Sequence, residues 1–293
     1  MKDICCVGHI TRDKIITPKQ TVKMAGGTAF YFAYGINQLP RKVDFQLLTK
    51  VGEGSMDEVE KMRQAGIEVV CHPSKHTVYF ENKYGANSNN RTQRVLAKAD
   101  PFTVAEMYDI EAKIFHLGSL LDDDFSPETV KYLSTKGRIS IDVQGYLREV
   151  RGENVHAVDW KDKEEILACT DILKLNEHEM TVISNSKNPR TVAIQLHEMG
   201  VDEVVITLGS YGSLIYSDGK FYEIPAYKPQ EVVDATGCGD TYSAGYLYCR
   251  SQGLGCLEAG KFAAAMCTLK LEHSGPFDRT IEEVEEIIRA ERR

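Results

Sequence analysis

The chain has 293 residues, with 35 Lys and Arg against 43 Asp and Glu, which gives a formal net charge of −8. Hydrophobic residues make up 42% and charged residues 27%, an ordinary globular composition that argues against intrinsic disorder. The negative balance argues against nucleic acid as the main partner, because phosphate backbones are bound by clustered Lys and Arg. It does not exclude a small phosphorylated ligand, which backbone amides and a helix N-terminus can bind inside an acidic protein.

The first residues, Met1–Val7, lead directly into a short apolar segment that does not resemble a secretory leader. No stretch approaches the roughly 18 apolar residues that a membrane span requires. The eight cysteines form no CxxC pair, and several lie in apolar segments. We therefore predict a cytoplasmic protein with buried thiols, without a membrane partner, zinc or disulfides.

Two segments in the first hundred residues look like strands inserted into a larger core. Residues 14–24 are polar and β-branched, and residues 76–98 alternate around a turn rich in Gly, Asn and Ser at 84–90. A small sheet that projects from the core as a lid would account for both segments. Edge strands of the main sheet are the alternative.

From residue 113 onward, short apolar strands alternate with helices. This order predicts an α/β fold in which a mostly parallel sheet is covered by helices on both faces, with its ligand site at the carboxyl ends of the strands. Residues 1–293 are expected to form one domain. The expected strands are 114–117, 139–143, 172–175, 204–208 and 213–217, and the expected helices are 127–136, 161–169, 177–184, 189–199, 239–252, 257–272 and 280–291.

The run from Asp234 to Gly245 carries the strongest chemical signal. Gly237 and Gly239 bracket one residue immediately before a helix, so backbone N–H groups can turn toward one point where the helix N-terminus adds positive potential. This arrangement predicts an anion hole. Asp240 lies in the first turn, where an Asp often only stabilises the helix, but beside a phosphate it could accept a proton from an attacking hydroxyl. The segment does not match the P-loop motif GxxxxGK[ST] or the dinucleotide-binding motif GxGxxG.

This run resembles the C-terminal signature of the ribokinase-like (PfkB) carbohydrate kinases, usually written DTxGAGD. Ala235 stands where the family usually has Thr, and Cys238 where it usually has Ala. The resemblance implies a three-layer α/β/α core with a small β-sheet lid that closes over the acceptor. It implies that Asp240 is the catalytic base. It also implies that the amides of Gly237, Cys238 and Gly239 stabilise charge on the γ-phosphate.

Four residues are candidates for binding the acceptor. Asp13 follows the first strand and is similar to the carboxylate that binds sugar hydroxyls in the family, although an Asp here could simply cap a turn. Gly26 and Gly27 resemble the paired glycines beneath the substrate, although they also suit an ordinary helix start. Asp142 ends a predicted strand, where a polar loop is the alternative. Tyr31 stands where the family often has Asn.

The donor side carries two weaker motifs. Asn176 and Glu179 resemble the family's NxxE, in which Glu positions Mg²⁺ through water, although the same residues could form a helix cap with a solvated Glu. Thr207–Gly212 resembles the TxGxxG turn at the nucleotide, and it also suits a hairpin turn. The nucleotide contacts that the resemblance implies are Asn176, Thr207, Gly209, Gly212 and Thr236. It also allows for a monovalent cation at the loops after Val232 and around Ser274.

The resemblance implies an ATP- and Mg²⁺-dependent phosphotransferase that acts on a hydroxyl of a small sugar or polyol. The segments 94–101, 141–148 and 272–278 look more like the plant myo-inositol kinase branch, which favours an inositol-like acceptor. Two alternatives stay open: a nucleoside kinase in which Phe30, Tyr31 and Phe32 stack on a base, and a catalytically inactive sensor that binds sugar or nucleotide. A homodimer through the lid is a further expectation.

Overall fold

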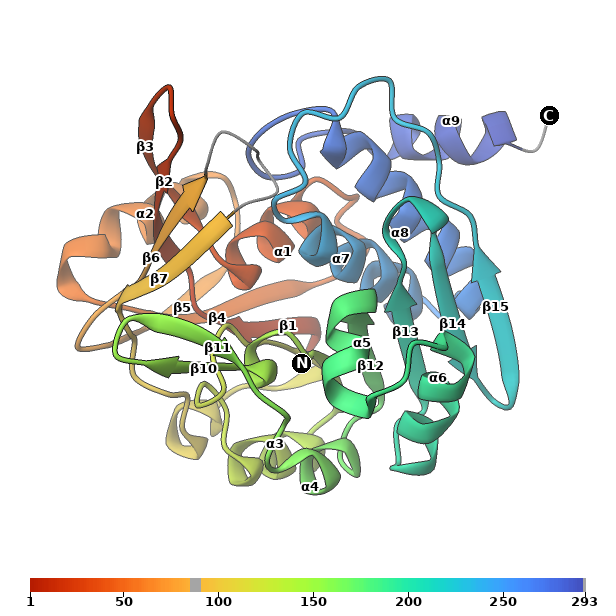
Figure 1. Ribbon diagram of the computed structural model, residues 1–293, viewed down its shortest axis with the longest axis horizontal. Coiled ribbons are helices and arrows are strands. Elements are labelled where there is room, and N and C mark those ends of the chain that lie inside the picture. Colours follow the sequence, from red (N-terminus) through yellow and green to blue (C-terminus); the bar gives the residue numbers. More distant parts are fainter. Residues whose placement is uncertain (85–90, 292–293) are drawn as a thin grey trace.

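The computed structural model describes residues 1–84 and 91–291, so residues 85–90 of the predicted hairpin turn lie outside it. Its helices and strands form one large sheet, a smaller second sheet and helices on both faces of the large one (Figure 1). The helices are α1 (Thr28–Asn37), α2 (Met56–Gln64), α3 (Pro127–Ser134), α4 (Lys163–Leu167), α5 (Glu177–Ser184), α6 (Pro189–Glu198), α7 (Cys238–Ser251), α8 (Cys256–Leu271) and α9 (Ile281–Glu291).

The large sheet has nine strands in the order β15-β14-β13-β12-β9-β8-β1-β4-β5. From β13 to β5 all neighbours are parallel, and only β14 and β15 run antiparallel. The predicted mostly parallel sheet is therefore confirmed. The strands are β1 (Lys2–Gly8), β4 (Phe45–Val51), β5 (Val69–Pro73), β8 (Ala112–Gly118), β9 (Arg138–Asp142), β12 (Ile172–Asn176), β13 (Glu203–Thr207), β14 (Ser213–Ser217) and β15 (Lys220–Ile224).

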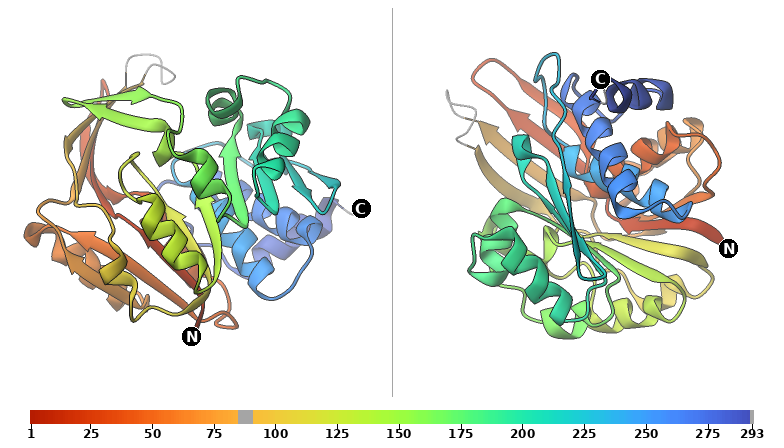
Figure 2. Two further views of the ribbon diagram at one scale, coloured as in Figure 1. Left: turned by 90° about the horizontal axis from the view of Figure 1, so that it is seen from below. Right: turned by 90° about the vertical axis from the view of Figure 1, so that its right-hand side faces the viewer.

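Each face of the large sheet carries its own hydrophobic core, because successive side chains of a strand point to opposite faces. In β1, Ile4 and Cys6 belong to the core cluster that α1, α2, α7, α8 and α9 cover, whereas Cys5 and Val7 belong to the cluster that α3, α4, α5 and α6 cover. The right-hand view of Figure 2 shows these two helical layers with the sheet between them. Among the described residues, no helix is long and apolar enough to cross a membrane.

The second sheet has six strands in the order β10-β11-β7-β6-β2-β3 and lies at the left of Figure 1. Four strands fall at the predicted insertions, and the hairpin of β10 and β11 was not predicted from the sequence. That hairpin is mostly polar: only Val150 and Val155 contact the apolar cluster beneath it, so its alternation is weak. The strands are β2 (Thr11–Ile16), β3 (Thr21–Gly26), β6 (Val78–Tyr84), β7 (Arg91–Ala97), β10 (Arg148–Arg151) and β11 (Asn154–Ala157).

Candidate active site

Several of the predicted site residues lie in one row across the large sheet. In the strand register, Gly8 pairs with Gly118, Gly118 with Asp142, and Asp142 with Lys174. Asn176 lies two residues after Lys174 in β12 and pairs with Thr207 of the next strand, β13. Because these strands are parallel, the row marks their common carboxyl end, where open α/β sheets bind ligands.

Asp240 lies where the N-termini of two helices converge. It occupies the first turn of α7, whose N-cap Gly237 has a left-handed backbone with φ of 77°, and it accepts a hydrogen bond from the Thr28 hydroxyl in the first turn of α1. Burial, assisted by the negative charge of Asp142, raises the pKa of Asp240 to about 7, although Lys174 and Thr28 act in the opposite direction. A carboxyl with this pKa can exchange a proton near neutral pH.

The neighbouring charges are a buried ion pair between Lys174 and Asp142. Lys174 Nζ lies 2.7 Å from Asp142 Oδ2, and the two side chains are 9% and 6% exposed. Burial by itself would raise the pKa of Asp142, but the charge and hydrogen bond of Lys174 outweigh it and lower that pKa. In turn, the charge and hydrogen bond of Asp142 raise the pKa of Lys174 although burial lowers it. Both groups are therefore charged at neutral pH.

Lys174 also borders the predicted anion hole, and sequence reasoning missed it. A Cβ atom built on Gly239 would lie 3.2 Å from Lys174 Nζ, so the ammonium is next to this backbone. The available signal was a lysine inside the apolar strand Ile172–Asn176, two residues before the NxxE motif. A charge in the middle of a buried parallel strand needs a partner, and that partner is Asp142.

Asn176 and Glu179 form a helix cap and line the same site. The Asn176 side chain accepts the backbone N–H groups of His178 and Glu179, and Glu179 Oε2 accepts the N–H of Asn176 at 2.8 Å. Burial and the charge of Asp142 raise the pKa of Glu179, with Lys174 opposing them. The cap is therefore present, but Glu179 is partly buried and not solvated as that alternative expected, so its carboxyl stays within the field of the site.

The candidate acceptor residues Asp13, Gly26 and Gly27 meet where β2, β3 and α1 come together. Asp13 Oδ1 accepts a hydrogen bond from the Thr11 hydroxyl at 2.7 Å, and a Cβ on Gly26 would lie 2.6 Å from Asp13 Oδ2. Gly27 has φ of 91°, and a Cβ there would lie 2.7 Å from the His9 carbonyl oxygen. A side chain at either glycine would displace the surrounding backbone or the carboxylate of Asp13.

The aromatic residues at the start of α1 belong to the core. Phe30, Tyr31 and Phe32 are 8%, 3% and 0% exposed, and Phe32 stacks on His116 with ring centroids 4.4 Å apart. A Cβ on Gly237 would overlap the ring of Tyr31, so this residue, which replaces the family's Asn, packs against the anion-hole loop. These three rings are packed inside the protein, so the structure does not support the expectation that they stack on a nucleoside base.

The remaining predicted donor residues lie on two exposed turns. Thr207–Gly212 connects the antiparallel strands β13 and β14, as the hairpin alternative expected, with φ of 56° at Gly209 and 90° at Gly212. Thr236 donates its N–H to Asp234 Oδ1 at 2.9 Å. Burial raises the pKa of the Cys238 thiol to about 12, so its sulfur is not a nucleophile near neutral pH.

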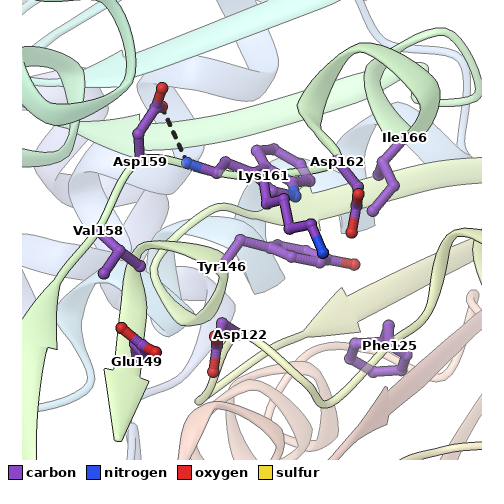
Figure 3. Close-up of a pocket in the computed structure, with 10 residues that line it drawn as sticks. Asp122, Phe125, Tyr146, Glu149, Val158, Asp159, Lys161, Asp162 and Ile166 are labelled. Atoms are coloured by element: carbon purple, nitrogen blue, oxygen red, sulfur yellow. Dashed lines mark hydrogen bonds between the residues drawn. The ribbon is translucent and has the colours of Figure 1, made fainter. Parts of the chain in front are cut away.

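A cavity of about 280 Å³ lies apart from this cluster and is lined in part by Glu149 of β10 (Figure 3). Tyr146 and Trp160 stack there with ring centroids 4.2 Å apart, and Asp122, Glu149 and Asp162 border them. A second hollow is lined by Arg190, Tyr211 and neighbouring residues beside the β13–β14 turn. Neither hollow includes Asp240 or Asp142, so we place the candidate active site by its charges and helix ends and not by cavity size.

Comparisons with known proteins show which family the chain resembles along its length. A family model described as "pfkB family carbohydrate kinase" matches residues 1–282. The chain is 30% identical over 263 residues to a cytidine kinase of Thermococcus kodakarensis, covering 86% of this chain and 90% of that protein. It is 26% identical to a nucleoside kinase of Methanocaldococcus jannaschii over 97% of each chain.

Among the similar solved structures, one binds a small polyol. It is a pyrophosphate-dependent kinase in the ribokinase family, complexed with a pyrophosphate analog and myo-inositol. Its TM-score is 0.86 at 27% identity, and the match covers 97% of this chain and 99% of that one. The ribokinase-like fold predicted from the signature at 234–240 is thereby confirmed.

Proposed function

The chain belongs to the pfkB family of carbohydrate kinases, and we propose that it transfers the γ-phosphate of ATP to a hydroxyl of a small polyol, with an inositol-like ring as the favoured acceptor. The observation that carries the proposal is the carboxyl of Asp240, which lies at the N-termini of α1 and α7 with a pKa of about 7. General-base catalysis is most efficient when the pKa of the base lies near the working pH.

In this proposal the acceptor lies against Asp13 and Gly27. Asp240 takes the proton of the acceptor hydroxyl while the hydroxyl oxygen forms a bond to the γ-phosphorus. The bond between the γ-phosphorus and the bridging oxygen breaks at the same time, and ADP leaves with that oxygen. The amides of Gly237, Cys238 and Gly239 donate hydrogen bonds to the phosphoryl oxygens that gain charge. Positioning and electrostatic stabilisation account for most catalysis of this kind.

The charges around Asp240 suit a divalent cation. The charges of Asp142, Glu179 and Asp240 all act on the ammonium of Lys174, and the charge of Asp142 raises the pKa of the other two carboxyls while that of Arg148 lowers it. Among the described residues these side chains form no ready-made group of metal ligands, so an ion here would be bound mostly through water. Mg²⁺ prefers oxygen ligands and usually keeps several of its waters. We expect Glu179 to hold it through water, where the ion, when bound, offsets charge on the donor phosphates.

Three observations bear on the acceptor. The similar structure whose description names myo-inositol supports the polyol, in agreement with the resemblance found in the sequence. The similarity to cytidine and nucleoside kinases supports a nucleoside as the second candidate. The burial of Phe30, Tyr31 and Phe32 removes the rings that were expected to stack on a base, which favours the polyol.

The second sheet is the candidate lid. Its strands β2 and β3 carry Asp13 and lead into Gly26 and Gly27, so the sheet borders the proposed acceptor position. Closure of such a sheet would exclude water and protect the donor from hydrolysis. In this proposal residues 1–293 act as one kinase domain, and a homodimer through the second sheet remains a prediction.

A substrate panel tests the proposal directly. Purified enzyme with Mg²⁺ is given ATP or pyrophosphate as donor and myo-inositol, fructose, ribose, cytidine or inosine as acceptor, and phosphate-ester formation is followed by ³¹P NMR alongside ADP release. We expect the highest rate with ATP and myo-inositol, and its loss in D240N. Turnover of nucleosides alone would contradict the polyol assignment, turnover with pyrophosphate alone would contradict the donor, and ligand binding without any turnover would indicate the inactive sensor.

A further inference from the structure

Lys270 is a fully buried lysine in the last turn of α8, with 0% of its surface exposed. Its ammonium nitrogen donates to the backbone carbonyl oxygens of Asp234 at 3.3 Å and His273 at 3.2 Å. Among the residues that the structure describes, these two carbonyls are its only hydrogen-bond partners, and it makes no ion pair. A buried positive charge is thus held by backbone carbonyl dipoles alone.

The two carbonyls belong to the two loops that border the phosphate end of the site. Asp234 lies three residues before Gly237, and its side chain holds the N–H of Thr236 at 2.9 Å. His273 follows α8 directly and belongs to the loop around Ser274. The ammonium of Lys270 therefore links the start of the anion-hole loop to the loop that follows α8.

The end of α8 supports the anion-hole loop at further points. The Leu271 carbonyl accepts the N–H groups of Val233 and Asp234 at 2.8 and 3.2 Å, and the Cys267 thiol donates to the Cys238 carbonyl at 3.0 Å. The charge of Lys270 also reaches Cys238, where it lowers the thiol pKa against the larger effect of burial. Position and charge of Lys270 are therefore both coupled to the loop that would hold the phosphate.

Ordinary helix capping does not explain this arrangement. A lysine near a helix C-terminus commonly bonds the last carbonyls while its ammonium stays in water. Full burial of an ammonium is unfavourable unless polar groups compensate it. Carbonyl oxygens from two loops are instead the kind of ligand that proteins use for a bound cation.

These are the loops at which the sequence resemblance allows for a monovalent cation, and the described residues do not fit one. We propose that Lys270 is a covalently attached cation that takes the place of a dissociable K⁺ or Na⁺ and holds the anion-hole loop. The reaction of this enzyme is therefore independent of monovalent cations. This inference rests on the proposed kinase function for its catalytic consequence.

Initial rates test the inference. The wild-type enzyme is assayed with Tris-ATP, Mg²⁺ and the best acceptor of the substrate panel, in tetramethylammonium chloride, KCl or NaCl at one ionic strength. We expect equal rates in all three salts. A rate that rises severalfold and saturates with K⁺ or Na⁺ would overturn the inference.

A neutral variant separates charge from shape. In tetramethylammonium chloride we expect K270M to lose about 100-fold in rate, as when a positioning group is removed, and to recover part of it with K⁺ or methylammonium. K261M, a half-exposed lysine on the same helix, is the matched control and should behave as wild type. A K270M enzyme as fast as wild type without added cation would overturn the inference.

A measurement without turnover distinguishes this inference from the proposed function. The melting temperature of the wild-type protein is compared in the same three salts. Equal melting temperatures support the internal cation even if no acceptor is phosphorylated, a result that would contradict only the proposed function. A specific rise in melting temperature with K⁺ or Na⁺ would overturn the inference whatever the activity.

Discussion

Charged side chains are buried at the phosphate end of the site, the region around Asp142, Lys174 and the loop before α7, and are largely exposed on the second sheet. At the phosphate end, Lys174 and Asp142 are almost fully buried and bonded to each other, and Lys270 is buried on carbonyls. On the second sheet, Glu81 bonds Lys14 at 2.8 Å and Arg94 at 3.1 Å, with the lysine and arginine side chains 30% and 46% exposed.

This difference predicts that the two regions tolerate substitutions to different degrees. A buried charge that loses its partner is costly, whereas an exposed pair contributes little to stability because water and salt screen it. The phosphate end should therefore tolerate almost no change. The second sheet, which borders the proposed acceptor position, should tolerate many changes, and acceptor preference can vary there without damage to the phosphate chemistry.

The largest effect is expected for D240N. Loss of a general base should lower kcat by about 1,000-fold, while the affinity for ATP stays nearly unchanged because the anion-hole amides remain. Rates of ester formation and calorimetric ATP titrations measure the two quantities. A D240N enzyme with near wild-type kcat would show that another group is the base and that the phosphate end tolerates substitution.

The same substitution should stabilise the fold at alkaline pH. The pKa of Asp240 rises from 3.8 to about 7 on folding, so between these values the folded protein binds a proton that the unfolded chain does not. Stability from this group therefore falls as the pH rises through that window, and the penalty is complete above it. Melting temperatures at about pH 8 should be higher for D240N than for wild type, and a lower value would contradict the burial of an ionised carboxyl.

The buried pair comes next. K174M leaves Asp142 buried and unpaired and should lower the free energy of unfolding by about 3–5 kcal/mol. The double variant D142N/K174M should be less destabilised than K174M, since no unpaired charge remains. Urea denaturation measures both, and strictly additive losses would show that the pair is not coupled.

A smaller effect is expected for G237A. Its Cβ would overlap the Tyr31 ring, and the left-handed backbone at Gly237 disfavours a side chain, so overpacking and strain should cost about 1–3 kcal/mol. Y31L should relieve the overlap but not the backbone strain. A double-variant cycle by urea denaturation should therefore show coupling between the two sites, and independent effects would contradict the contact.

The smallest effect should come from the second sheet. R94A removes exposed pairs to Glu81 and Glu153 and should change the free energy of unfolding by less than about 1 kcal/mol, with kcat unchanged. K98A, which removes a partly exposed lysine that follows β7 and pairs with Asp123, is the matched control. A loss of kcat in R94A comparable to that of K174M would erase the contrast between the two regions.

The sequence predicted the parts that depend on local pattern. Alternating strands and helices gave the parallel sheet, and the glycines before Asp240 marked the start of α7. It missed what depends on distant pairing. The β10–β11 hairpin joins the second sheet through a contact between Asn154 and Arg94.

The residues of the candidate site also fall into two groups, those found from a local motif and those recognised only from contacts between distant segments. Asp240 and its glycines follow one another along the chain, so one motif was enough to find them. Lys174 is recognised only through its partner Asp142 on a neighbouring strand, and Lys270 only through carbonyls of two loops. A single sequence does not tell which buried charge meets which group, because such pairs are set by tertiary packing.

The pH dependence of kcat/KM tests the central claim, that Asp240 is the base of phosphoryl transfer, most directly. The profile is measured from about pH 5 to 9 for wild type and for the residual activity of D240N, because kcat/KM reports the ionisation of the free enzyme. We predict that the wild-type value falls as the pH decreases through about 7, where Asp240 becomes protonated, and that this decline is absent in D240N. A decline near pH 7 that persists unchanged in D240N would contradict the account.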